Sequence, residues 1–203
     1  MSVTVQTPPF RTNLLELENL WPEQGQWTYE DYKQLPDDRW IYEIIEGELY
    51  MSPAPKPRHQ KSVLKLGSKL DLFCEEHSVG EIYVAPIDVK LPGFADPVQP
   101  DVVFVLHNRL SIVKEDYIEG APDFLAEVLS PSNWIVDRQK KFEIYAKAGV
   151  KEYWIIDPKM RTIEQFVLRD SNYELLGKFE EGEAVRSEVV QGFSIEVNEI
   201  CTF

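Results

Sequence analysis

Two carboxylates stand in stretches of sequence that otherwise read as buried strands. In QPDVVFVL, Asp101 comes directly before a strongly apolar run, and in DFLAEVLS the alternation of side chains puts Glu127 on one strand face with Leu125 and Leu129. A carboxylate among leucines is costly unless it is paired or bound to a cation. Taken singly, Asp101 is typical of a turn residue at the start of a strand. Glu127 taken singly is also explained by an ion pair with a nearby lysine.

Considered together, the two acids indicate a metal site. Neighbouring strands lie about 4.8 Å apart, so carboxylates at matching heights can share one hard cation. Magnesium prefers oxygen ligands and keeps several waters, which suits it to activating water against a phosphate. The expected ligands are Asp101 and Glu127, with the backbone carbonyl of Val128 completing the site around Mg²⁺, or around Mn²⁺ in its place.

Cleavage of a phosphodiester also calls for a protein cation near the attacking water or the developing negative charge, and lysine supplies a compact one. The strand position two residues after Glu127 would suit such a lysine, but Leu129 occupies it. The following helix offers a substitute, because Asp137, Lys141 and Tyr145 are spaced i, i+4 and i+8 and lie close to one helical face. The alternative is a simple surface pair of Asp137 and Lys141, which would contribute little energy.

The hydrophobic pattern predicts the elements that position these residues. TYEDYKQLPD is typical of a short helix with a Thr cap, and WIYEIIEGELYMSP of a β-hairpin that turns at Glu46 and Gly47. The order of the remaining elements predicts an α/β sheet covered by helices. Helices are expected over residues 57–77 and 137–148, and strand-like runs over residues 81–92, 99–106, 123–130, 152–157, 162–168, 172–179 and 193–197.

Length and composition predict one domain, and the lack of a spanning or signal segment predicts a cytoplasmic location. The chain has 203 residues, of which 43% are hydrophobic, so it can bury one sizeable core. Residues 1–26 contain several polar residues and prolines and are expected to form an N-terminal arm before a domain over residues 27–203. The longest apolar runs, such as VVFVL, are far short of the roughly 20 residues that span a bilayer, and the start MSVTVQTPPF lacks the regions of a secretory signal. Cys74 and Cys201 have no paired spacing and are expected to be buried or idle thiols.

A basic segment contrasts with the formal net charge of −14. Residues 56–69, KPRHQKSVLKLGSK, contain five Lys or Arg and no acid, and Lys61, Lys65 and Lys69 share one face of the expected helix. This face predicts a phosphate-facing patch for nucleic acid. The alternative is an ordinary solvated helix face.

Several motifs in this order resemble one known family. The succession EIIEGELYMSPAPKPRHQ, APIDVKLPG, QPDVVFVL, APDFLAEVLSPSN and DRQKKFEIYAKAGVKEYWIIDP is similar to the Uma-two family of endonucleases, in the PD-(D/E)XK restriction-endonuclease-like superfamily. The resemblance covers about residues 28–200. It implies a mixed central β-sheet flanked by helices, with an N-terminal β-hairpin, extra C-terminal strands and metal-dependent phosphodiester hydrolysis.

The resemblance also assigns roles to single residues. Asp101 and Glu127 match the metal-binding acids, and the lysine of the usual E-x-K motif is moved to the helix, where it matches Lys141 in KKFEIYA. Lys140 is the neighbouring competitor. Glu46 and His59 match an acidic position in the hairpin and a His-Gln at the first helix, with an extra metal or water contact as their implied role. Their alternatives are a turn residue for Glu46 and a helix-start residue for His59.

The leading hypothesis is a metal-dependent endonuclease that hydrolyses DNA. In it Asp101 and Glu127 hold Mg²⁺ or Mn²⁺, and Lys141 assists the attacking water. The second hypothesis keeps the fold as a catalytically silent binding or assembly module. A homodimer is expected by analogy with nucleases that pair two sites to cut two strands.

Overall fold

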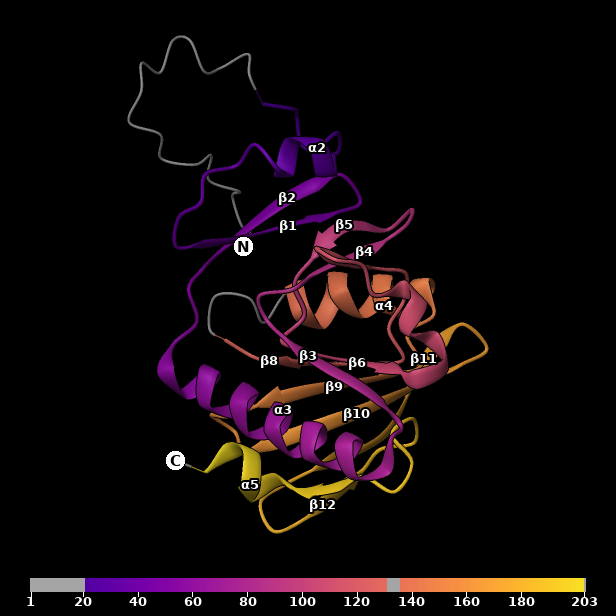
Figure 1. The fold of residues 1–203 in the computed structure, drawn as a ribbon. Helices are drawn as coiled ribbons and strands as arrows, with labels where there is room; N and C mark the ends of the chain where they lie inside the picture. The colour runs from indigo at the N-terminus through magenta and orange to yellow at the C-terminus, as the bar shows by residue number, and fades with distance from the viewer. Residues whose placement is uncertain (1–20, 131–135, 203) are drawn as a thin grey trace.

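A six-stranded mixed sheet forms the centre of the molecule (Figure 1). The computed structural model describes residues 21–130 and 136–202, without the side chains of residues 136 and 137. The central strands β8 and β9 pair in parallel, whereas the other neighbours in this sheet are antiparallel. In sheet order the strands are β11 (Asn172–Phe179), β10 (Thr162–Arg169), β9 (Glu152–Asp157), β8 (Phe124–Val128), β6 (Val102–Leu106) and β3 (Gly80–Val84).

Two layers cover the central sheet, one on each face (Figure 1). One face packs against α3 (Pro57–His77) and α5 (Val197–Cys201), and the other packs against α4 (Phe142–Ala148) and a five-stranded sheet. The five strands, in sheet order, are β2 (Glu48–Pro53), β1 (Trp40–Ile45), β5 (Ala95–Val98), β4 (Asp88–Leu91) and β7 (Tyr117–Glu119). These layers confirm the mixed α/β fold with helices on the sheet.

The predicted alternation along β8 is confirmed. Phe124 and Val128 lie in the cluster under α3, and Leu125 lies in the cluster under α4. All five residues of β8 are buried because the strand lies in the middle of the sheet. Glu127 therefore points to the α4 side, toward the five-stranded sheet.

The apolar stripe of α3 also forms as expected. Val63, Leu66 and Leu70 are buried, Phe73 packs at their edge, and Cys74 extends the same stripe. This spacing of three and four residues buries one face of the helix against the sheet. Both cysteines of the chain are buried free thiols, as expected.

The hairpin of β1 and β2 turns at Glu46 and Gly47, as predicted. Both residues have positive φ, 51° and 76°, which is the backbone of a tight two-residue hairpin turn. A Cβ on Gly47 would meet the carbonyl oxygen of Gly25 at 2.5 Å, so glycine is required there. The N–H groups of Gly25 and Trp27 donate to the Gly47 carbonyl, which ties the end of the expected arm to the hairpin. Residues 1–20 of that arm lie outside the described residues.

Several elements differ from the sequence prediction. The single run expected over residues 81–92 is two strands, β3 and β4, which belong to different sheets. The chain leaves one sheet for the other between these strands, and Pro86, which has no N–H to donate, lies at this point. The strands β5, β7, β12 (Ala184–Arg186) and the helix α5 were not predicted, and β13 (Ser194–Glu196), which pairs with β12, lies within the expected run 193–197.

A buried acid, Asp123, lies directly before β8, and three other residues donate hydrogen bonds to its carboxylate. Its carboxylate accepts hydrogen bonds from the Leu106 N–H at 3.0 Å, from Arg109 Nη1 at 2.7 Å and from Lys151 Nζ at 2.7 Å. Burial raises the pKa of Asp123, but these donors outweigh burial and leave the pKa below its ordinary value. The folded protein thus favours the ionised form of this group.

Within the described residues, the structure contains no helix that is both long and apolar enough to cross a membrane.

Candidate active site

Three carboxylates, a lysine and a histidine line one small cavity of ≈ 30 Å³. The cavity lies where the hairpin strand β1 and the start of α3 meet β6 and β8 of the central sheet. The five ionisable side chains are Glu43, His59, Asp101, Glu127 and Lys141. The structure therefore brings together four of the five residues predicted to be catalytic, and it adds Glu43.

Asp101 is fixed at the start of β6. The last residue pair between β6 and β8 is Val102 with Ala126. Beyond this pair, Oδ2 of Asp101 accepts a hydrogen bond of 2.8 Å from the Val128 N–H, so the side chain replaces a backbone partner. The same oxygen lies 3.0 Å from Nε2 of His59, which comes from the first turn of α3. The side chain is thus held by a strand and by a helix, and it presents an oriented carboxylate to the cavity.

Glu127 is 3% exposed, and two side chains of the following helical segment contact its carboxylate. Its Oε1 lies 3.0 Å from Nζ of Lys141 and accepts a hydrogen bond of 2.8 Å from the Tyr145 hydroxyl. Lys141 and Tyr145 are four residues apart and so point to the same side of the helix. Lys141 ends a π-helical segment, Val136–Lys141, and such segments are frequent at functional sites.

Glu43 of β1 is the site residue that the sequence prediction missed. Its Oε1 lies 2.8 Å from Lys141 Nζ and accepts the N–H of Gln99 at 2.7 Å. The neighbours Tyr42 and Ile44 face the opposite way, into a separate core cluster around Trp27. Lys141 is therefore an ammonium group placed between two buried carboxylates, one from each sheet.

Glu46, the acidic residue that was predicted to contribute from the hairpin, is not among the residues that line the cavity, and its role stays a prediction. It stands at the turn with its side chain 43% exposed, 3.8 Å from Lys140 and 3.7 Å from Lys147. Glu46 lies in the turn that follows β1, whereas Glu43 lies within β1, three residues earlier. Lys140, the competitor of Lys141, is likewise 43% exposed and points to this outer side.

Tyr145 is a hydrogen-bond donor under ordinary conditions. Burial raises its pKa well above 10.0, and the neighbouring charge of Glu127 raises it further. The hydroxyl therefore keeps its proton and donates it in a hydrogen bond to the carboxylate. This contact fixes the Glu127 side chain without adding charge.

The family model described as "Uma2: Putative restriction endonuclease" matches residues 29–198. The chain belongs to the Uma2 family. The match spans the hairpin, the cavity and all strands of the central sheet. It confirms the family to which the sequence motifs pointed.

A solved structure shares the Uma2 fold of this chain. A crystal structure of a "putative nuclease belonging to DUF820 from Anabaena variabilis" superposes with a TM-score of 0.70 at 19% sequence identity. The match covers 86% of this chain and 97% of that chain. No curated protein matches the sequence. At this identity the likeness shows the fold, and the restriction-endonuclease-like architecture is thereby supported.

Two of the three lysines predicted to face nucleic acid are engaged within the protein. Lys65 Nζ donates to the Thr202 carbonyl at 2.6 Å, and Lys69 Nζ lies 2.6 Å from Oε2 of Glu199. These contacts join α3 to the C-terminal helix and weaken the prediction of a phosphate-facing patch on Lys61, Lys65 and Lys69. The side chain of Asp137, which was expected to support the site, lies outside the described residues.

The donor set of the cavity fits a hard cation. Asp101 and Glu127 offer carboxylate oxygens, and Mg²⁺ is commonly held by one or two carboxylates together with waters and substrate phosphate. Within residues 21–130 and 136–202, no cluster of three or more His, Cys, Asp and Glu side chains has the geometry of a complete metal centre. The residues thus suit an ion that keeps much of its water, and they do not form an all-protein cage.

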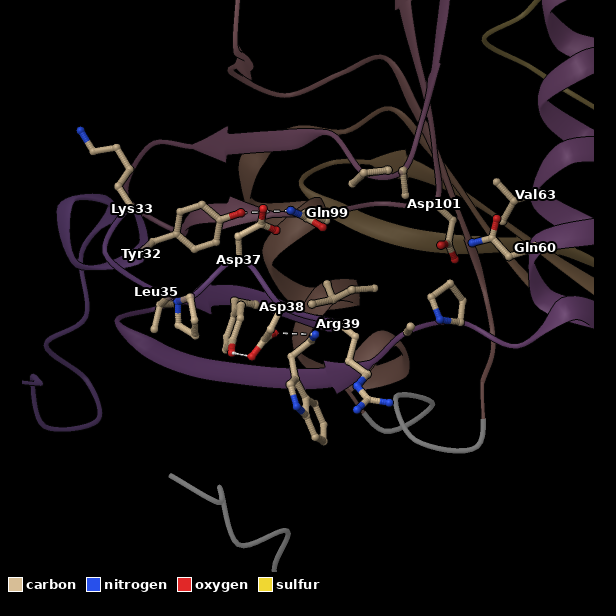
Figure 2. Close-up of a pocket in the computed structure, with 18 residues that line it drawn as sticks. Tyr32, Lys33, Leu35, Asp37, Asp38, Arg39, Gln60, Val63, Gln99 and Asp101 are labelled. Atoms are coloured by element: carbon tan, nitrogen blue, oxygen red, sulfur yellow. Dashed lines mark hydrogen bonds between the residues drawn. The ribbon is translucent and has the colours of Figure 1, made fainter. Parts of the chain in front are cut away.

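A larger cavity of ≈ 530 Å³ opens beside Asp101 on the hairpin side. Figure 2 shows Asp101 and Gln60 at one end of this cavity and Tyr32 and Lys33 at the other. Gln99 lies in its wall, where its side-chain amide donates to the Tyr32 hydroxyl at 3.0 Å. Because the Gln99 N–H also binds Glu43, this wall helps to hold the smaller cavity in shape.

Proposed function

We propose that this Uma2 protein is a metal-dependent endonuclease that hydrolyses phosphodiester bonds of DNA. The observation that supports the proposal is the convergence of Lys141 and Tyr145 on Glu127, next to Asp101 on the neighbouring strand. A buried carboxylate with a lysine and a second acid beside it, in a cavity of a nuclease-like fold, suits phosphodiester chemistry. Family membership supports the reaction class.

Asp101 and Glu127 are the proposed ligands of Mg²⁺, with Mn²⁺ as an alternative ion and the Val128 carbonyl as a further ligand. When bound, the ion would polarise the phosphate and lower the pKa of a water molecule. Glu43 adds a third carboxylate to the same cavity. We propose Glu43 for the hairpin's acidic role in place of Glu46.

The protein's own residues have separate tasks in the proposed reaction. A water oxygen forms a bond to phosphorus and gives up one of its protons, while the bond to the leaving sugar oxygen breaks and that oxygen takes up a proton. Lys141 places a positive charge where negative charge develops on the phosphate, and it keeps Glu43 and Glu127 together. Tyr145 orients Glu127, and His59 orients Asp101 at 3.0 Å.

A homodimer is part of the proposal, because two copies of one site are needed to cut both strands of a duplex together. Light scattering of the purified protein at working concentration measures this directly. A mass of one chain would restrict the proposal to nicking by single sites.

Plasmid nicking tests the proposed function. Supercoiled DNA is incubated with the protein in Mg²⁺, in Mn²⁺ and in a chelator, and the relaxed and linear products are quantified. We expect cleavage only with metal, and its loss in Asp101→Ala, Glu127→Ala and Lys141→Ala. Lys140→Ala is the matched control, since it removes an adjacent but exposed lysine. Equal trace activity in the wild type and all variants would refute the assignment.

A further inference from the structure

A cavity distinct from the one in Figure 2 adjoins the catalytic cavity on the side away from the hairpin turn. It has a volume of ≈ 510 Å³, and four of its lining residues also line the catalytic cavity: Pro53, Pro55, His59 and Ser130. His59 links the two spaces, because its ring lies 3.0 Å from the Asp101 carboxylate and also borders the larger cavity. A ligand in this cavity would therefore lie directly beside the proposed site of chemistry.

The ≈ 510 Å³ cavity is lined by cationic side chains, although the protein as a whole is strongly acidic. Lys56, Arg58 and Lys159 line it, and none of its described lining residues is acidic. The chain as a whole carries a formal charge of −14, and the catalytic cavity beside it holds three carboxylates. The cavity shown in Figure 2, by contrast, includes Asp37 and Asp38 in its lining. Of these two large cavities, only the cationic one complements a polyanion.

The start of α3 and the turn after β9 set the backbone positions of the three cations. Lys56 and Arg58 flank the first residue of α3, a helix of 21 residues. Lys159 lies in the turn after β9, where Asp157 Oδ1 accepts the N–H groups of Lys159 and Met160, each at 2.9 Å. The first turn of α3 contains no acid, although acids are favoured and cations disfavoured at that end of a helix. Cations at this end of a helix are unfavourable, and a bound anion would offset that effect.

We infer that this cavity is a subsite for the backbone phosphates of the DNA strand next to the phosphodiester that is cleaved. The subsite rests on the proposed function for its place in the reaction, but its charge and its ligand class can be tested without cleavage. Arg58 offers paired N–H donors that suit phosphate oxygens, and the two lysines act as compact charges. The apolar stems and the prolines of the lining shape the wall beside the sugars.

The test is the binding of fluorescein-labelled single-stranded and duplex DNA, followed by anisotropy in a chelator over a range of salt concentrations. The cavity variant combines Lys56→Ala, Arg58→Ala and Lys159→Ala. The control removes the same charge from exposed cations that line neither cavity among the described residues, with Lys114→Ala, Lys147→Ala and Arg186→Ala. Circular dichroism checks that both variants are folded.

We expect the cavity variant to bind more weakly and to lower the slope of log Kd against log salt by about 2 to 3, since each lost phosphate contact lowers it by about 1. The control should leave the slope nearly unchanged. An equal effect of both variants, an unchanged cavity variant, or a wild type that binds neither DNA even at low salt would overturn the subsite.

Cleavage assays separate the subsite from the proposed function. If the wild type cuts plasmid but the cavity variant binds and cuts like it, the function stands and the subsite fails. If the wild type does not cut but the cavity variant alone loses salt-dependent binding, the subsite stands and the endonuclease proposal fails.

Discussion

Replacing Lys141 by methionine removes the ammonium group and keeps much of the side-chain volume. In the wild type this group lies 2.8 Å from Glu43 and 3.0 Å from Glu127, whose residues are 5% and 3% exposed. The Lys141→Met variant leaves two buried carboxylates, with hydrogen bonds from Tyr145 and Gln99 but without this cation.

Removing one partner of a buried ion pair typically costs about 3–5 kcal/mol of unfolding free energy. For a domain of this size, 1 kcal/mol corresponds to about 2–4 °C in melting temperature, so the expected loss is roughly 6–20 °C.

Thermal unfolding followed by circular dichroism at neutral pH measures the loss. Lys140→Met is the control, since Lys140 is 43% exposed and lies 3.8 and 3.9 Å from its partners, an arrangement worth less than about 1 kcal/mol. The double variant Lys141→Met with Glu43→Gln should recover part of the stability, because it also removes one of the two carboxylate charges that face the deleted ammonium group. If Lys141→Met is as stable as Lys140→Met, Lys141 is not the counterion of the two acids.

Three further predictions concern single side chains. Because the pKa of Asp123 is lowered in the folded protein, its contribution to stability is complete above the ordinary carboxyl pKa and is lost as pH falls through the folded pKa. In urea unfolding from pH 2 to 6, Asp123→Asn should therefore lose less of its unfolding free energy at acidic pH than the wild type does. Glu43→Ala should lower metal-dependent nicking by at least about 100-fold, while Glu46→Ala leaves it near wild type, and equal effects would contradict the placement of Glu43. Tyr145→Phe should cost about 1.5–3 kcal/mol in chemical denaturation, since it removes a hydrogen bond to a charged acceptor, and an unchanged midpoint would argue against that bond.

The central acid and its lysine could be predicted from sequence because local rules decide their directions. Period-two alternation fixes the face of Glu127 on β8, and the four-residue spacing puts Lys141 and Tyr145 on one side of their helix. The structure places both of these side chains on the same carboxylate oxygen. The roles of these residues in catalysis stay predictions.

Glu43 could have been found by the same reasoning as Glu127, since it is the one charged residue in the strand WIYEII. Glu46, the acid at the turn, is the residue that matches the acidic position of the family in the hairpin. The face of β1 that meets α4 is decided by pairing between β1 and β5, through Ile45 and Ala95, which are far apart in the chain. Local periodicity alone does not contain that information.

The lysine face of α3 shows the same limit. Its spacing predicts a shared surface, but Lys69 meets Glu199, which lies 130 positions away in the sequence. The partner helix α5 is only five residues long and was not predicted. A charged helix face can thus be a solvent surface, a ligand surface or a packing surface, and long-range contacts decide among them.

Calorimetric titration with Mg²⁺ and Mn²⁺ tests the central claim most directly, because it does not depend on turnover or on the choice of DNA. The account predicts a divalent-ion site in the wild type and in Glu46→Ala, and its loss in Asp101→Ala and in Glu127→Ala. Binding that is the same in the wild type and in these two variants, or undetectable in the folded wild type, would contradict the claim that Asp101 and Glu127 form a metal site.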